Sequence, residues 1–164
     1  MGAGAHADRR KAGKSLNAIA VEQRTHIRQI EEGKVDRIMD TVITVIQVVL
    51  GLLLTVGGLL KLALPYATYT HQPGVAWSKE FKPEHLRLIG VLEVSGGVGL
   101  IVPLVLDSLT MLTPLAAVGI ALYMSGAMAT HLRRSEYPHM VGILLFFLGP
   151  ALFLAYGTLV GLAV

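Results

Sequence analysis

The chain has 164 residues, of which 53% are hydrophobic and only 15% are charged. Soluble domains usually carry about 25% charged residues, so this balance indicates a membrane protein if the apolar residues form long runs. The chain has no cysteine, which excludes disulfides, thiolate metal sites and iron–sulfur clusters held by this chain. The net charge of +3 is not gathered into a patch on a soluble fold, so no nucleic-acid partner is predicted.

Residues 1–38 form a basic tail that differs in composition from the rest. It holds eight of the fourteen Lys and Arg, namely Arg9, Arg10, Lys11, Lys14, Arg24, Arg28, Lys34 and Arg37. The first dozen residues are mainly Gly, Ala and charged, and disorder is predicted there. From residue 15 to 30 apolar residues recur at helical spacing, which predicts either an interfacial helix or a solvated, partly helical tail. No apolar core follows the early basic residues, so a cleavable signal peptide is not predicted.

Residues 39–164 form a second domain with four long apolar runs. The runs are 41–64, 86–106, 111–132 and 140–162. Each exceeds the roughly 18 residues that a helix needs to cross a bilayer. Backbone groups inside lipid must pair within their own segment, so each run should be helical. Short links after the second and third runs make neighbours antiparallel. The predicted fold class is therefore all-α: a polytopic membrane protein with an antiparallel four-transmembrane-helix bundle.

Small residues in the runs are predicted to let helices approach closely in lipid. They are Gly57, Gly58, Ser95, Gly96, Gly97, Gly99, Gly119, Ser125 and Gly126. Pro150 lies inside the fourth run, and we expect it to kink that helix. The one long loop, residues 65–85, contains three prolines and four aromatic residues, one of them Trp77. Such a loop is either a lid over a site or an aromatic belt at the membrane surface, and the composition favours a belt with some folding over the helix ends.

Glu93 is the only charged residue between Leu88 and Leu106 in the second run. It lies roughly 9 Å past Arg87 along a helix. A lone carboxylate at that depth costs about 2.5 kcal/mol or more, so Glu93 should face protein, find a partner or be protonated. The antiparallel order places Lys61 and His131 in the same half of the bilayer.

Three interpretations of this polar cluster remain open. In the first, Lys61 pairs with Glu93 to fix helix register, and His131 caps the pair or donates to a backbone carbonyl. In the second, the cluster lines a pocket that binds a quinone carbonyl or a lipid headgroup. In the third, His131, Glu93 and one loop histidine hold a metal, although the spacing matches no recognised ligand motif. The loop histidines are His71, His85 and His139. Haem is not predicted, because only one histidine lies within a span.

Three segments together resemble the DoxX-like membrane proteins. They are GGLLKLALP at the end of the first run, KPEHLRLIGVLEVSGGVGLIVP, and ALYMSGAMATHLRRSE. The resemblance covers about residues 40 to 160 and implies a four-helix membrane fold. The matched positions are Lys61, Arg87, Glu93, His131 and Arg133. The family takes its name from a small subunit of a thiosulfate:quinone oxidoreductase, and relatives include bacterial proteins of redox or stress complexes and eukaryotic cargo receptors or assembly factors. A likeness of fold does not by itself define a reaction.

The sequence therefore predicts an accessory subunit of a membrane complex, redox-linked and binding quinone or lipid. The alternatives are an assembly factor or chaperone for other membrane proteins, and a quinone-linked oxidoreductase component. The residues assigned to the ligand-binding or structural polar cluster are Lys61, Glu93, His131, Arg87, Trp77 and Arg133. No catalytic residue and no metal ligand are assigned, and no complete active site is expected in this chain.

The predicted location is the bacterial plasma membrane, with both termini in the cytoplasm. The resemblance supports this orientation more than the charges do, because basic residues flank the spans on both sides. Beyond the lipid bilayer, the expected partner is a membrane protein or another copy of the chain.

Overall fold

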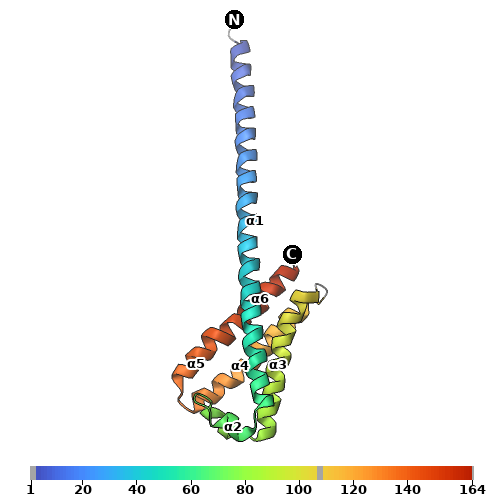
Figure 1. Cartoon of the computed structure of the whole chain (residues 1–164). Coiled ribbons are helices and arrows are strands. Elements are labelled where there is room, and N and C mark those ends of the chain that lie inside the picture. Colours follow the sequence, from blue (N-terminus) through green and yellow to red (C-terminus); the bar gives the residue numbers. More distant parts are fainter. Residues whose placement is uncertain (1–2, 107–108, 164) are drawn as a thin grey trace. The chain divides into compact units, whose positions relative to one another are not determined.

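The computed structural model describes residues 3–106 and 109–163. Within those ranges the chain is helical and contains no strand. The elements are α1 (Ala3–Ala63), α2 (Tyr66–Thr70), the 3₁₀ helix η1 (Ala76–Glu80), α3 (Pro83–Leu106), α4 (Leu112–Arg133), α5 (Tyr137–Ile143), the π-helical turn η2 (Leu144–Leu148) and α6 (Gly149–Ala163). Figure 1 shows them in chain order from blue to red.

The chain divides into two compact units, residues 1–42 and residues 43–164. In the first unit the backbone of α1 is helical from Ala3, where the sequence predicts disorder over the first dozen residues. The first proline of the chain is Pro65, so no strong helix breaker interrupts the Ala-, Lys-, Arg- and Glu-rich segment before it. Of residues 1–20, the structure describes the side chain of Ile19 alone. The placement of residues 15–30 at the membrane interface therefore stays a prediction.

The predicted membrane spans are confirmed. In the described part of the chain, four helical stretches are long and apolar enough to cross a bilayer: Val21–Ala63, Pro83–Leu106, Leu112–Arg133 and Tyr137–Gly161. The protein is an integral membrane protein with a four-helix bundle. α3 begins at Pro83, three residues before the predicted apolar run, because proline suits the first position of a helix, where no N–H is needed.

The core of residues 43–164 lies where α1, α3, α4 and α6 meet. α4 packs against both α3 and α6 (Figure 1). The buried residues of this core are small or aliphatic, apart from one methionine: Leu50, Leu54, Leu100, Ala117, Ile120, Ala121, Met124, Ala151, Leu154 and Ala155. Large apolar side chains on the outer faces are exposed, as a lipid-facing surface requires.

Glycines bring α1 and α3 into backbone contact. A Cβ atom on Gly58 would lie 2.6 Å from the carbonyl oxygen of Gly90, and one on Gly97 would lie 2.5 Å from that of Gly51. This close approach confirms the packing role predicted for Gly58 and Gly97. The same prediction is wrong for Gly119 and Gly126, because no atom lies within 4 Å of a Cβ built on either residue. Both glycines face open space.

The fourth span is interrupted at the position that the sequence predicts. The π-helical turn Leu144–Leu148 comes directly before Gly149 and Pro150, and the Gly149 N–H donates to the carbonyl of Leu144. Pro150 has no N–H, and its ring needs room beside the preceding turn. One wider turn supplies that room, so the proline is accommodated by a π-helical turn between α5 and α6.

Candidate functional site

A buried ion pair joins α1, α3 and α4 inside the bundle. Lys61 Nζ lies 2.6 Å from Glu93 Oε2, and both residues are 8% exposed. Tyr123 of α4 donates its hydroxyl to Glu93 Oε1 at 2.8 Å. Lys61 also donates to the Gly57 carbonyl at 3.4 Å. Each carboxylate oxygen of Glu93 therefore accepts one hydrogen bond. These two hydrogen bonds offset the cost of desolvating the carboxylate, which the sequence predicted.

The loop after α1 folds over this ion pair. The Lys61 ammonium lies 5.6 Å from the ring centroid of Tyr69 and 5.9 Å from that of Trp77, within the range of cation–π attraction. Tyr66 donates to the carbonyl of Phe81 at 2.9 Å, which ties α2 to the end of η1. The sequence favoured an aromatic belt with some folding over the helix ends. In the structure Tyr69 and Trp77 lie over the polar cluster, and the belt at the membrane surface stays a prediction.

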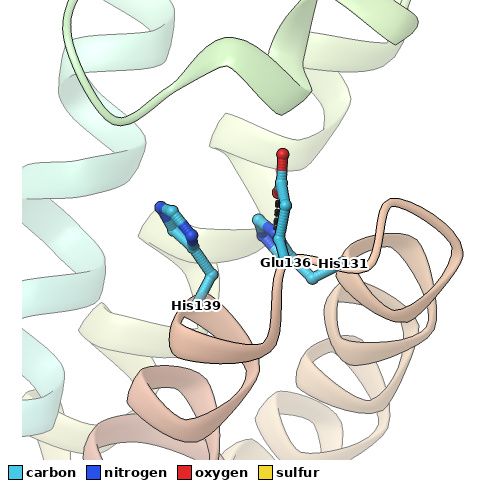
Figure 2. A group of neighbouring side chains, drawn as sticks. All are labelled: His131, Glu136 and His139. Atoms are coloured by element: carbon cyan, nitrogen blue, oxygen red, sulfur yellow. Dashed lines mark hydrogen bonds and ion pairs between the residues drawn. The ribbon is translucent and has the colours of Figure 1, made fainter.

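His131 does not cap the Lys61–Glu93 pair. Its Nδ1 lies 2.6 Å from Glu136 Oε2, in the turn that follows α4. Figure 2 shows the Glu136 carboxylate against the His131 ring, with the ring of His139 beside them. The two imidazole rings are parallel, with centroids 5.2 Å apart, and Trp77 packs edge-on against His131 at 6.1 Å. The cluster thus has two parts, one centred on Glu93 and one on Glu136.

Arg134 holds the second part in place from the surface. Its Nε donates to Glu136 Oε1 at 2.7 Å, and its Nη1 pairs with Glu80 of η1. The hydrogen bond from Arg134, followed by that from His131, lowers the pKa of Glu136 below the ordinary glutamate value. Glu136 and then Glu80 raise the pKa of Arg134. Glu136 is therefore an ionised carboxylate at neutral pH.

The chain turns between α4 and α5 through a left-handed residue. Ser135 has φ of 56°, and the Glu136 N–H bonds back to the carbonyl of His131 at 3.0 Å. This pattern is that of a Schellman helix end, in which glycine usually takes the left-handed position. The turn places Glu136 directly under the last turn of α4 and so sets its contact with His131.

Both parts of the cluster line one cavity of about 500 Å³. Its polar wall contains Lys61, Glu93, Tyr123, Thr130, His131 and His139, and its aromatic wall contains Tyr69, Trp77, Phe81 and Phe147. Gly126 also lines it, and a Cβ built on that glycine would meet no atom of another helix within 4 Å. A cavity of this size with mostly apolar walls and a few convergent polar groups is typical of small-molecule sites.

Four of the six residues assigned from the sequence lie together here: Lys61, Trp77, Glu93 and His131. Arg87 and Arg133 do not, since both are exposed and neither lines the cavity. The adjacent Arg134 takes the place expected for Arg133. Sequence reasoning missed Tyr123 as the second donor to Glu93. Tyr123 lies thirty residues from Glu93, and a lone tyrosine in a span also suits a lipid-facing position.

Comparison of the chain with models of known protein families identifies its family. The DoxX-like family matches residues 45–155, which is most of the membrane unit. The chain belongs to the DoxX-like family. No curated protein and no solved structure matched the chain. The resemblance seen in the three sequence segments is therefore confirmed.

In this DoxX-like protein the matched segment contains every residue that lines the cavity, from Lys61 to Phe147. The arrangement offers donors from Lys61 and a histidine ring, together with flat aromatic walls. It offers no thiol, since the chain has no cysteine. The geometry suits the binding of a flat, polar head within the bundle.

Proposed function

We propose that this DoxX-like protein is an accessory membrane subunit that binds the carbonyl-bearing head of a quinone. The observation that carries the proposal is the cavity of about 500 Å³ between the Lys61–Glu93 pair and the aromatic loop. A structural ion pair alone needs no cavity beside it, and packed apolar residues would hold the helices as well.

The charges of the site favour a neutral head with hydrogen-bond acceptors. Lys61 and Glu93 neutralise each other at 2.6 Å, so the deep end of the cavity attracts a phosphate only weakly. An ammonium group has three N–H donors, and two of those on Lys61 are directed at Glu93 and the Gly57 carbonyl. The third can donate to a quinone carbonyl, while the rings around the ammonium stack against the quinone ring.

An apolar groove next to the cavity suits a quinone tail. It has a volume of about 530 Å³. Its apolar walls are Leu53, Pro138, Gly142, Ile143, Phe146 and Phe147. His139, Ile143 and Phe147 line both hollows. A head in the cavity can therefore continue into a tail in the groove, which is lined by α5, the π-helical turn and Leu53 of α1.

The accessory role follows from the redox chemistry. Reducing a quinone to a quinol takes two electrons and two protons, so an electron donor must reach the bound ring. With no cysteine, this chain offers neither a dithiol nor a thiolate-held cluster as that donor. We assign quinone binding to this protein and electron delivery to a partner protein in the membrane.

Trp77 provides a direct test, because it is the single tryptophan of the chain and lines the cavity. A short-chain quinone titrated into the purified protein should quench Trp77 fluorescence in a saturable way. Gly126→Leu should fill part of the cavity and weaken the apparent Kd at least tenfold, about 1.4 kcal/mol. Gly119→Leu is the matched control, since Gly119 is equally open but lies outside the cavity lining.

Equal, non-saturable quenching in all three proteins would contradict quinone binding. Competition by phosphatidylglycerol would instead assign the cavity to an anionic lipid headgroup. Loss of other membrane proteins from cells that lack this protein, without any saturable quenching, would support an assembly factor.

A further inference from the structure

We propose that His131, Glu136 and His139 form a binding site for a divalent transition-metal ion, with zinc as the reference ion. In the described part of the chain these three residues each offer a ligand atom within 4.8 Å of the others. The proposal does not depend on quinone binding, although His131 and His139 also line the cavity. The sequence left open a metal held by His131, Glu93 and one loop histidine. In the structure Glu136 takes the place of Glu93 in that set, and the histidine is His139.

The chemistry of the three ligand atoms favours a divalent transition-metal ion. Two imidazole nitrogens and one carboxylate oxygen are typical of zinc and of other divalent first-row metals, whereas calcium and magnesium prefer oxygen ligands alone. The three side chains come from one short stretch of chain, the last turn of α4, the following turn and the first turn of α5. Backbone hydrogen bonds fix this stretch, since Glu136 donates to the His131 carbonyl and His139 donates to the Glu136 carbonyl.

Small movements of the side chains complete the coordination geometry. Zinc lies about 2.0–2.2 Å from nitrogen and oxygen ligands, which places tetrahedral ligands roughly 3.4 Å apart. His131 Nδ1 and Glu136 Oε2 are now 2.6 Å apart, which is a hydrogen-bond distance. A metal ion placed between them takes the place of that hydrogen bond, and the neutral ring that binds it through Nδ1 carries its proton on Nε2. The His139 ring is exposed and stacks parallel to His131, so it has to turn its lone pair toward the ion.

The surrounding residues orient the ligands as outer partners of metal sites do. Arg134 holds Oε1 of Glu136 and leaves Oε2 directed at His131. Glu80 pairs with Arg134 and so balances its charge, while Trp77 packs against the ring of His131. Outer partners of this kind fix the orientation of the ligands, and their loss typically lowers metal affinity 10- to 100-fold. Arg134 is therefore a positioning residue for the site.

Three protein ligands leave one coordination position open, as in catalytic rather than structural zinc sites. His131 and His139 both line the cavity of about 500 Å³. We expect the open position to face the hollow that contains the Lys61–Glu93 pair, where a carbonyl or carboxylate oxygen of a bound molecule would occupy it.

The test is zinc titration of the full-length, untagged protein in detergent, after removal of metals with EDTA. Calorimetry should show one zinc ion per chain. Cobalt(II) should show visible d–d bands, as a four- or five-coordinate site would. His139→Ala changes an exposed side chain and should keep the fold while weakening zinc binding at least tenfold, and Glu136→Gln should do the same. Arg134→Gln should weaken it 10- to 100-fold.

His71→Ala and His85→Ala are the matched controls, since both residues are exposed histidines outside the cluster, His71 at the end of α2 and His85 in the first turn of α3. Both controls should bind zinc as the unsubstituted protein does. The proposal is overturned if no stoichiometric zinc binds, or if the control variants lose as much affinity as His139→Ala. Saturable quinone quenching in EDTA would then leave the proposed function intact.

Discussion

Two polar clusters link the same three helices at two levels of the bundle, and they differ in charge. At one level Gln47 of α1 donates to the carbonyl of Leu100 in α3 at 2.6 Å and to Thr113 Oγ1 in α4 at 3.0 Å. At the other, Lys61 of α1 pairs with Glu93 of α3, which accepts from Tyr123 of α4. Only the second cluster lines the cavity. A neutral amide is enough to join α1, α3 and α4, so the charges at the Lys61 level exceed what helix packing needs.

Of the substitutions that test the difference between the two clusters, Glu93→Gln should have the largest effect on stability. The substitution leaves Lys61 buried without a counter-charge and should lower the free energy of unfolding by about 3–5 kcal/mol. SDS titration of the purified protein, followed by circular dichroism, measures the change. The double variant Lys61→Met/Glu93→Leu should recover most of the loss, because a packed apolar pair replaces the charges. A Glu93→Gln protein as stable as the original would show that the pair is not desolvated.

Gln47→Leu should cost less, about 1–3 kcal/mol, because it removes neutral hydrogen bonds and leaves the Thr113 hydroxyl without its donor. The same titration gives the value. Quinone quenching of Trp77 should be unchanged, since Gln47 lies outside the cavity lining. A Gln47→Leu protein that lost quinone affinity would remove the distinction between the two clusters.

The glycine contact between α1 and α3 can be tested with neighbouring residues. Gly58→Ala should destabilise the protein by about 1–3 kcal/mol, because its Cβ would meet the Gly90 carbonyl oxygen at 2.6 Å. Gly57→Ala is the control. Its Cβ would lie 3.6 Å from Glu93 Oε2, so alanine fits and should be neutral or stabilising by up to about 1 kcal/mol. Equal effects of the two substitutions on SDS unfolding would contradict the close crossing.

The smallest expected effect is at the turn beside Glu136. Ser135→Gly should raise stability by about 1 kcal/mol, because glycine takes the left-handed conformation without the steric cost that serine bears. The measurement is the thermal unfolding midpoint in detergent. Ser135→Ala should not raise it, since alanine bears the same cost. A higher midpoint for Ser135→Ala would mean that φ at this residue is not left-handed.

Much of the fold could be predicted from the sequence because the bilayer imposes simple rules. Four apolar runs of sufficient length had to be helices, since lipid offers no partner to backbone groups. The cost of a lone carboxylate in lipid required that Glu93 face protein, find a partner or be protonated, and Lys61 was one candidate partner, which the structure confirms. The interruption at Pro150 followed from the missing N–H of proline. Each inference rests on a local property of the chain and on the surrounding solvent.

The rest depended on which way neighbouring side chains face, and only the tertiary structure decided that. Arg133 and Arg134 are adjacent and chemically identical, yet only Arg134 reaches Glu136 and Glu80, because the chain leaves α4 through a left-handed turn at Ser135. Gly58 and Gly126 are both span glycines, yet Gly58 touches a helix backbone and Gly126 opens the cavity. The sequence determined which groups had to be satisfied inside the membrane. The crossing of the helices determined which partners satisfied them, because a rotation of about 100° per residue turns neighbouring positions to different faces.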